Sequence, residues 1–101
     1  MSANPVRGEA AIRVNGLELV LRPSFAALVS AEAELGPLFA LVERAAAGRL
    51  AMGEMVALFW HCLREPAPMP RDAFAEGVAA GGLAAATPAL KLLLGQILGG
   101  R

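Results

Sequence analysis

His61 and Cys62 are the single histidine and the single cysteine of the chain, and they are adjacent in the sequence Trp60-His61-Cys62. A cysteine thiolate beside a histidine base can act as a nucleophile. This pair lies in a segment with helical periodicity, where neighbouring side chains point about 100° apart and do not face each other. One histidine and one cysteine also fall short of the four ligands of a zinc site. We therefore expect no catalytic residue and no metal ligand here, with Cys62 in or beside the core and Trp60 and His61 partly exposed.

Other signatures of ligand chemistry are weak as well. The glycines near the C-terminus, Gly95, Gly99 and Gly100, have neither the Walker spacing nor the Lys-Ser/Thr that follows it. The glutamates from Glu32 to Glu76 mostly fall on polar faces of expected helices, where a solvated surface explains them better than acid–base catalysis does. The sequence therefore predicts a protein that is not an enzyme and that binds no cofactor.

The charges of the chain are balanced. Nine Lys and Arg residues offset nine Asp and Glu residues, so the formal net charge is zero and the isoelectric point is about 6.6. Proteins that bind nucleic acid carry a basic surface, so nucleic acid is not an expected partner. Zero net charge also removes the repulsion that keeps small proteins apart, which favours association with other chains or with further copies of this one.

The apolar stretch of residues 77–100 carries Lys91 as its single charge. A membrane-spanning helix needs about 20 mostly apolar residues, but Gly81-Gly82 and Thr87-Pro88 interrupt this stretch. We therefore expect no membrane span and no membrane partner. The first eight residues have no apolar run of the secretory kind, and one cysteine allows no internal disulfide, so a cytoplasmic protein is expected.

Residues 9–22 have the pattern of a β-hairpin. Asn15-Gly16 supplies the two positive-φ residues of a type I′ turn, and apolar residues alternate on both sides of this turn. The predicted pairs are Ala10–Leu21, Ile12–Leu19 and Val14–Leu17 on one face, with Ala11–Val20, Arg13–Glu18 and Glu9–Arg22 on the other. An isolated hairpin is marginal in water, so its apolar face should pack on helices, while both of its edges are candidates for pairing with another chain.

Five helical segments are predicted after the hairpin, at about residues 24–35, 37–47, 52–64, 70–80 and 88–98. Ser24 is a candidate N-cap, Pro37 suits the first turn of a helix, and three prolines exclude a helix in the 65–70 linker. The residues expected on the inner faces are Phe25, Leu28, Val29 and Leu35; Leu38, Leu41, Val42, Ala45 and Ala46; Met52, Met55, Val56, Phe59 and Leu63; Phe74 and Val78; and Leu90, Leu93, Leu94, Ile97 and Leu98. The predicted fold class is therefore α+β and mostly α, with an N-terminal two-stranded hairpin, then four or five short helices. Residues 1–8 are expected to be a flexible N-terminus and residues 9–101 a single small domain.

The leucine stripe of the last helix is wider than a helix of that length needs in so small a domain. It either completes the core or forms an amphipathic surface that docks on partner helices or on a second copy. Tryptophan is enriched at the centres of protein interfaces, so Trp60 is a further candidate contact. The residues expected to bind a partner are Trp60, Leu90, Leu93, Leu94 and Ile97.

Packing and capping residues follow a recognisable order between the hairpin and the third helix. They are Gly8-Glu9, Leu19-Val20-Leu21-Arg22, Ala26-Ala27-Leu28, Glu32, Glu34-Leu35-Gly36, Leu38, Leu41, Glu43-Arg44, Gly48, Glu54 and Leu63-Arg64. This order resembles the gene transfer agent tail family, which is related to the tail assembly chaperones of long-tailed phages. The resemblance covers residues 8–64 and extends loosely to the Ala/Leu-rich C-terminus.

The resemblance implies a non-enzymatic role in building the tail of a phage or phage-like particle. Chaperones of this kind bind the long, helical, aggregation-prone tape measure protein and help to recruit tail tube subunits around it. The resemblance therefore implies these two proteins as partners, and a chaperone that is absent from, or minor in, the mature particle.

Two alternatives stay open. Relatives have also been labelled as tail tube proteins, so the chain could be a structural, tube-associated protein that is retained in the particle. A ring subunit with a β-lined wall needs a much larger β content than one hairpin. A small homo-oligomeric adaptor is the other alternative, because zero net charge and an open hairpin edge both favour self-association.

Overall fold

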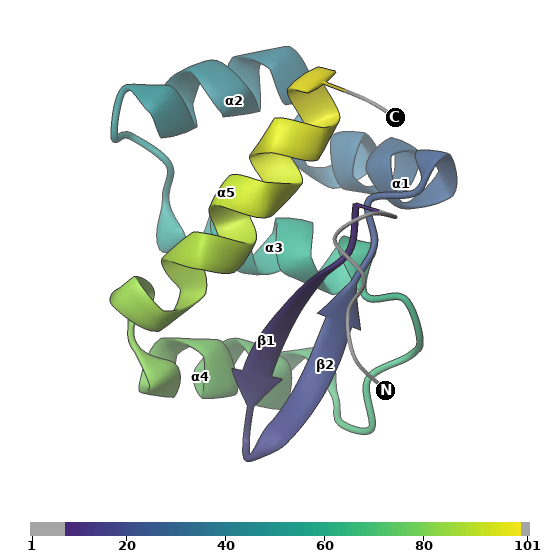
Figure 1. Ribbon diagram of the computed structural model, residues 1–101, viewed down its shortest axis with the longest axis vertical. Coiled ribbons are helices and arrows are strands. Elements are labelled where there is room, and N and C mark those ends of the chain that lie inside the picture. Colours follow the sequence, from purple (N-terminus) through teal and green to yellow (C-terminus); the bar gives the residue numbers. More distant parts are fainter. Residues whose placement is uncertain (1–7, 100–101) are drawn as a thin grey trace.

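A computed structural model describes residues 8–99 of the protein. In this range a two-stranded antiparallel sheet precedes five helices, which confirms the predicted fold class (Figure 1). The elements are β1 (Ala10–Val14), β2 (Leu17–Leu21), α1 (Phe25–Leu35), α2 (Leu38–Ala46), α3 (Met52–Cys62), α4 (Arg71–Gly81) and α5 (Leu83–Gly99). The predicted flexible N-terminus falls on residues 1–7, which lie outside the described residues, and on Gly8, which is instead buried beside Gln96 of α5.

The hairpin has the predicted turn and register. Asn15 and Gly16 have φ angles of 54° and 79°, as a type I′ turn requires. The pairs run from Val14 with Leu17 at the turn to Ala10 with Leu21 at the far end. The predicted pairing of Glu9 with Arg22 is wrong, because β1 begins one residue later and Glu9 turns inward.

Glu9 is a buried carboxylate at the entrance to β1, with an exposed fraction of 2%. Nη1 of Arg64 donates to both carboxylate oxygens of Glu9, at 3.2 Å each. An ionised carboxylate that is buried needs such a charged donor, because the cost of removing it from water is otherwise uncompensated. This ion pair joins the start of the hairpin to the segment that follows α3.

The outer edge of β2 is closed by the same chain. The backbone N–H of Arg22 donates to the carbonyl of Cys62 at 2.6 Å, and the N–H of Arg64 donates to the carbonyl of Val20 at 2.9 Å. Leu63 therefore forms a bridge with Leu21, and α3 ends at residue 62 instead of residue 64 because the chain becomes extended there. The prediction of two open edges is wrong for β2.

The outer edge of β1 has no such cover among the described residues. In an antiparallel pair, two opposite residues that exchange no hydrogen bonds with each other both direct their N–H and C=O groups away from the partner strand, towards the two outer edges of the sheet. Ala11 is opposite Val20 and Arg13 is opposite Glu18, so the N–H and C=O groups of Ala11 and Arg13 point outward. No backbone hydrogen bond from either residue to another described segment is present. β1 is therefore the open edge of the sheet.

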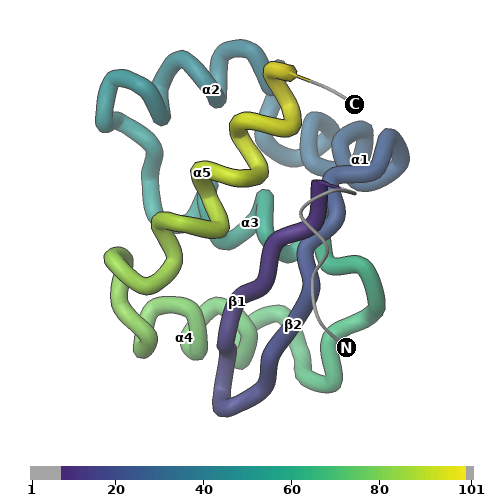
Figure 2. The backbone as a smooth tube through the Cα atoms, in the orientation of Figure 1, coloured from purple at the N-terminus to yellow at the C-terminus, as the bar shows by residue number. Residues whose placement is uncertain are grey.

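α3 lies in the middle of the molecule, with the other helices and the hairpin around it (Figure 2). Its side chains at Leu58, Phe59 and Cys62 are fully buried. α1 and α4 pack directly on it, and α4 and α5 both pack on β1. The core thus forms around one helix. Its buried members include the predicted residues Leu38, Leu41, Val42, Met55, Val56, Phe74, Val78 and Leu93.

The predicted inner face of α1 is partly wrong. The hydroxyl of Ser24 caps the helix as expected, accepting from the N–H of Ala27 at 3.2 Å. Phe25, however, is 84% exposed and Val29 is exposed as well. The helix packs on α3 through Ala31, which is fully buried, with Leu28 beside it. Small alanine side chains let the two helices approach closely, so the buried face is rotated away from Phe25 and Val29.

Three residues at the ends of other predicted stripes are exposed: Ala46, Met52 and Leu98. α5 also begins at Leu83 instead of at about residue 88, so Pro88 lies inside the helix. An interior proline costs about 3 kcal/mol because it removes a helical hydrogen bond and crowds the preceding turn. Ala86 and Ala89 on either side of Pro88 are buried, so packing on the core favours a continuous helix across the proline. The predicted break at Gly81-Gly82 and the non-helical linker of residues 65–70 are both confirmed.

No single helix within residues 8–99 has the length and apolar composition to cross a membrane. Two pairs of consecutive helices, α1 with α2 and α4 with α5, have sufficient length and apolar composition when the two helices are taken together. The chain bends by 77° between the helices of the first pair and by 111° between those of the second.

Gly77 is where α4 touches the turn of the hairpin. A Cβ at this position would lie 2.5 Å from Cγ1 of Val14 and 2.8 Å from Oδ1 of Asn15. We expect Gly77→Ala to lower the free energy of unfolding by about 1 to 3 kcal/mol, because it overpacks this contact. Urea denaturation followed by circular dichroism measures the change.

Gly95→Ala in α5 is the matched control, because a Cβ there has nothing within 4 Å. Alanine has the higher helix propensity, so this variant should be as stable as the wild type or up to about 1 kcal/mol more stable. Equal stability of both variants would contradict the close contact at Gly77.

Candidate functional site

A groove of about 440 Å³ lies between the end of α2, the start of α3 and one face of α5. We call it the α5 groove. Its most exposed large apolar side chains are Leu83, at 54%, and Met52, at 41%. The lining residues are Ala45, Gly48, Leu50, Ala51, Met52, Met55, Leu83, Thr87, Leu90, Lys91 and Leu94. Lys91 is the single charged side chain in this set, so the groove is a predominantly apolar surface.

Hydrogen bonds of Glu54 hold the α2–α3 side of the groove in place. Its Oε1 accepts from the backbone N–H of Ala51 at 3.0 Å, which caps the start of α3. Its Oε2 accepts from the guanidinium of Arg44 on α2. The bond from Ala51, followed by that from Arg44, lowers the pKa of Glu54 below its usual value, so the carboxylate stays ionised at neutral pH. One side chain thus joins two walls of the groove.

The structure brings together two of the five predicted partner-binding residues. Leu90 and Leu94 both line the α5 groove and are partly buried. Leu93 is fully buried in the core, so its predicted partner contact is corrected to a packing role: it lies on the inner side of α5. Ile97 packs against the core outside the groove lining.

Trp60 is also separate from the groove. Its ring packs edge-on against Phe74 of α4, with 5.3 Å between the ring centroids and 60° between the planes. Trp60 is partly exposed as expected, and much of its surface is used to join α3 to α4.

Nine of the eleven lining residues are not among the predicted contacts, and two of these nine, Leu83 and Met52, are large, apolar and exposed. Leu83 precedes residue 88, where the sequence predicts the last helix to begin, so it lies outside the predicted stripe. Met52 was expected on the inner face of its helix. Both are on the rim, and the signal that could have identified Leu83 is its spacing of seven residues from Leu90, two helical turns along one face.

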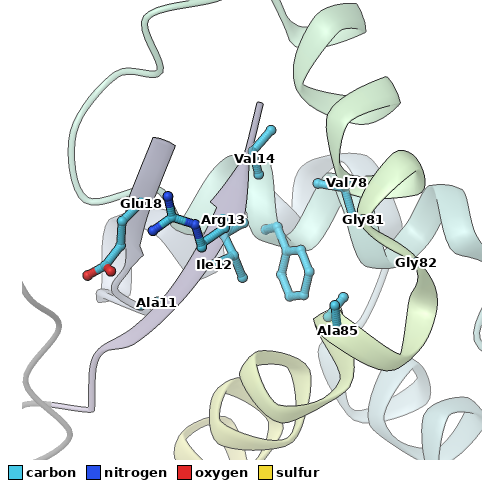
Figure 3. A pocket seen from close by; sticks show the side chains of 11 residues that line it. Ala11, Ile12, Arg13, Val14, Glu18, Val78, Gly81, Gly82 and Ala85 are labelled. Carbon is cyan, nitrogen blue, oxygen red and sulfur yellow. The ribbon is translucent and has the colours of Figure 1, made fainter. Parts of the chain in front are cut away.

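A second, smaller pocket of about 280 Å³ follows the open edge of β1 (Figure 3). Ile12 and Val14 point into it from the strand, and Val78 and Ala85 face them from the α4–α5 junction. Arg13 and Glu18 stand on the strand side with charges of opposite sign, so they give the pocket no net electrostatic preference.

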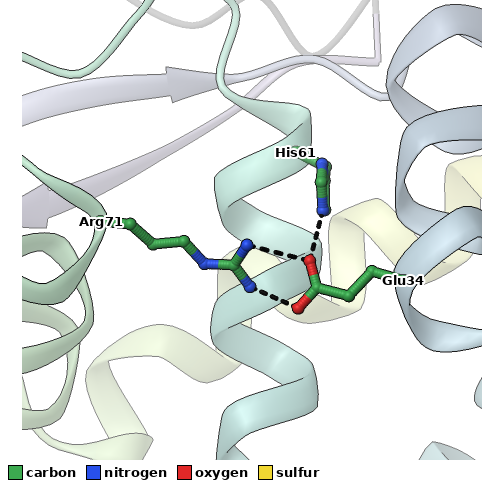
Figure 4. A network of polar contacts seen from close by, with 3 residues as sticks. All are labelled: Glu34, His61 and Arg71. Carbon is green, nitrogen blue, oxygen red and sulfur yellow. Dashed lines mark hydrogen bonds and ion pairs between the residues drawn. The ribbon is translucent and has the colours of Figure 1, made fainter.

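Glu34, His61 and Arg71 form a polar cluster that joins α1, α3 and α4 (Figure 4). The guanidinium of Arg71 donates to both oxygens of Glu34, at 2.9 and 2.5 Å. Nε2 of His61 lies 2.8 Å from Oε1 of the same carboxylate. The bond from Arg71, and then that from His61, lowers the pKa of Glu34 to about 2. The cluster connects three helices.

Cys62 is fully buried, as the sequence predicts. Burial raises the pKa of its thiol to about 12, because the apolar core disfavours the thiolate. The thiol is therefore neutral, and thiolate is the form that acts as nucleophile or metal ligand. Among residues 8–99, no group of three or more His, Cys, Asp or Glu side chains is placed to hold a metal ion.

The α5 groove is the kind of surface that accepts an amphipathic helix, because apolar side chains from several helices converge on it. A family profile described as "phage tail tube protein, GTA-gp10" matches residues 7–100, almost the whole chain. The chain therefore belongs to this family of phage and gene transfer agent tail proteins, in agreement with the resemblance seen in the sequence. No curated protein and no solved structure matches it.

The Glu34 cluster makes stability depend on pH. A folded-state pKa of about 2, below the ordinary 4.5, stabilises the fold above about pH 4.5, and this contribution is lost as the pH falls towards 2. We expect Glu34→Gln to lower the free energy of unfolding at neutral pH, with a deficit that shrinks between those two pH values and vanishes below them. Denaturation curves at a series of pH values measure this difference.

Glu43→Gln is the control, because the Glu43 side chain is exposed and makes no hydrogen bond or ion pair among the described residues. It should follow the wild type at every pH. A deficit of the Glu34→Gln protein that persisted unchanged at pH 2 would contradict an ionic origin.

Proposed function

We propose that this protein is a tail assembly chaperone that shields the tape measure protein while the tail is built, and that it does so without catalysing a reaction. The observation that supports this proposal is the α5 groove, an apolar surface between three helices with Leu83 and Met52 exposed on its rim. Membership of a phage tail protein family supplies the context.

The groove fits a helical partner on physical grounds. Full burial of a leucine or methionine side chain is worth about 1.5 to 3 kcal/mol, so a partner helix that covers the rim gains appreciable free energy. Methionine is flexible and adapts to surfaces of different shape, and two methionines, Met52 and Met55, line the groove. Such a site tolerates variation along a long partner. This tolerance is what a protein needs if it covers successive segments of one extended helix.

The proposal includes a place of action. Tails are assembled inside the host cell, so we propose that the chaperone acts in the cytoplasm and leaves the tape measure protein as tail tube subunits arrive. These subunits would be the second partner.

A structural role in the tail is the second candidate, and the description of the family as tail tube proteins favours it. Within residues 8–99, however, β structure consists of two five-residue strands and one bridge. A closed ring wall is made of longer strands from each subunit. This low β content supports the chaperone over the tube subunit.

Leu83→Glu tests the groove. Co-expression with the tape measure protein of the same phage-like element, followed by affinity capture, should yield a complex with the wild type. The variant should lose at least about 90% of the captured tape measure protein, because a charge on the rim must be desolvated when the partner binds. Circular dichroism checks that the variant is folded.

Leu92→Glu is the matched control: the same substitution on the same helix, at a residue that is 48% exposed and does not line the groove. It should retain wild-type capture. Equal loss in both variants would contradict a role for the groove, and absence of a complex with the wild type would contradict the chaperone function.

Mass spectrometry of purified particles separates the two candidate functions. A chaperone that leaves during assembly should be missing from particles, or present far below the level of the tail tube subunit. A copy number comparable with that of the tail tube subunit would favour the structural role instead.

A further inference from the structure

The rim of the α5 groove carries positive charge without compensation. Lys91 is the single charged residue in the lining. Arg49 is exposed and stands in the chain between two further lining residues, Gly48 and Leu50. Neither Lys91 nor Arg49 forms an ion pair with another described residue. Both cations are thus available to a partner.

The carboxylates nearest to the groove in the chain do not neutralise these cations. Glu54 is already occupied by Arg44 and by the N–H of Ala51. Glu43 precedes the lining residue Ala45 by two positions, which places its side chain about 200° around α2 from that residue. The groove therefore combines an apolar floor with a positive rim.

We infer that the α5 groove selects amphipathic helices whose apolar face is flanked by Asp or Glu. This inference rests on the proposed function and adds the charge of the partner segment. Rim charges contribute to the choice of partner and to the rate of association more than to affinity. An acidic flank gains attraction to Lys91 and Arg49, whereas a basic flank brings like charges together, and both effects contribute to selectivity.

The same charges argue against a second copy of this chain as the occupant. A two-fold interface places the same patch of both molecules face to face. If two α5 grooves met in this way, Lys91 and Arg49 would approach their own counterparts, with no free carboxylate in either lining to separate them. An acidic helix of another protein is the better match.

Two synthetic helical peptides test the inference. They share one leucine-rich apolar face, and their flanking positions are all Glu in one and all Lys in the other. The Glu peptide can form exposed ion pairs with Lys91 and Arg49, whereas the Lys peptide places like charges beside both. The wild-type protein should therefore bind the Glu peptide about tenfold more tightly than the Lys peptide at low salt. The difference should shrink as salt screens the rim charges. Isothermal titration calorimetry measures both dissociation constants.

Lys91→Glu should abolish or reverse this preference. Arg22→Glu is the control, because it makes the same change of charge at an exposed residue that does not line the groove. It should keep the wild-type ratio of affinities within about twofold, as expected for a distant screened charge. Equal binding of the two peptides by the wild type, tighter binding of the Lys peptide, binding of neither peptide, or an unchanged ratio in Lys91→Glu would overturn the inference.

The outcome is separable from that of the proposed function. Capture of the tape measure protein by the wild type together with equal binding of both peptides would overturn the charge preference and leave the chaperone role standing. Preference for the Glu peptide without capture of the tape measure protein would support the charge preference and contradict the chaperone role.

Discussion

The burial of α3 is the constraint on which the other elements depend. A chain of 101 residues can form only a small core, and here that core is arranged around one helix whose residues Leu58, Phe59 and Cys62 are fully enclosed. α1 and α4 pack on its sides, and its C-terminal end continues into the segment that pairs with β2. The first turn of the same helix supplies Met52 and Met55 to the α5 groove. The candidate binding surface is therefore held by the most enclosed element of the fold.

Ion pairs of three carboxylates also connect the elements of the fold to one another. Glu34 joins α1 to His61 at the end of α3 and to Arg71 at the start of α4. Glu54 joins α3 to α2, and Glu9 joins the entrance of β1 to the residues that follow α3. Each carboxylate thus connects at least two segments of the fold. Since a small domain buries less of its apolar surface than a large one, such connections help to fix the relative positions of its helices.

Local sequence signals were sufficient to predict the structure where one or two residues determine the backbone geometry. Asn15-Gly16 fixed the hairpin register, and Gly81-Gly82 fixed the end of α4. They failed where the outcome depends on packing between distant segments. Phe25 is exposed because α1 packs on α3 through the face that holds the buried Ala31, which periodicity within α1 cannot reveal. The end of α3 was misplaced for a similar reason, because its last carbonyl bonds to the edge of β2.

The candidate site was predictable to the same extent. The leucine stripe predicted Leu90 and Leu94. Leu83 was missed because a proline is expected to begin or end a helix, so the helical residues before Pro88 were not predicted.

The closed edge of β2 has a separate consequence. A sheet can be extended from molecule to molecule without limit only if each copy offers two free edges. Residues 62–64 occupy the Val20–Arg22 end of one edge from within, so pairing through β1 would join two copies of this protein of zero net charge and would not continue through that end of β2.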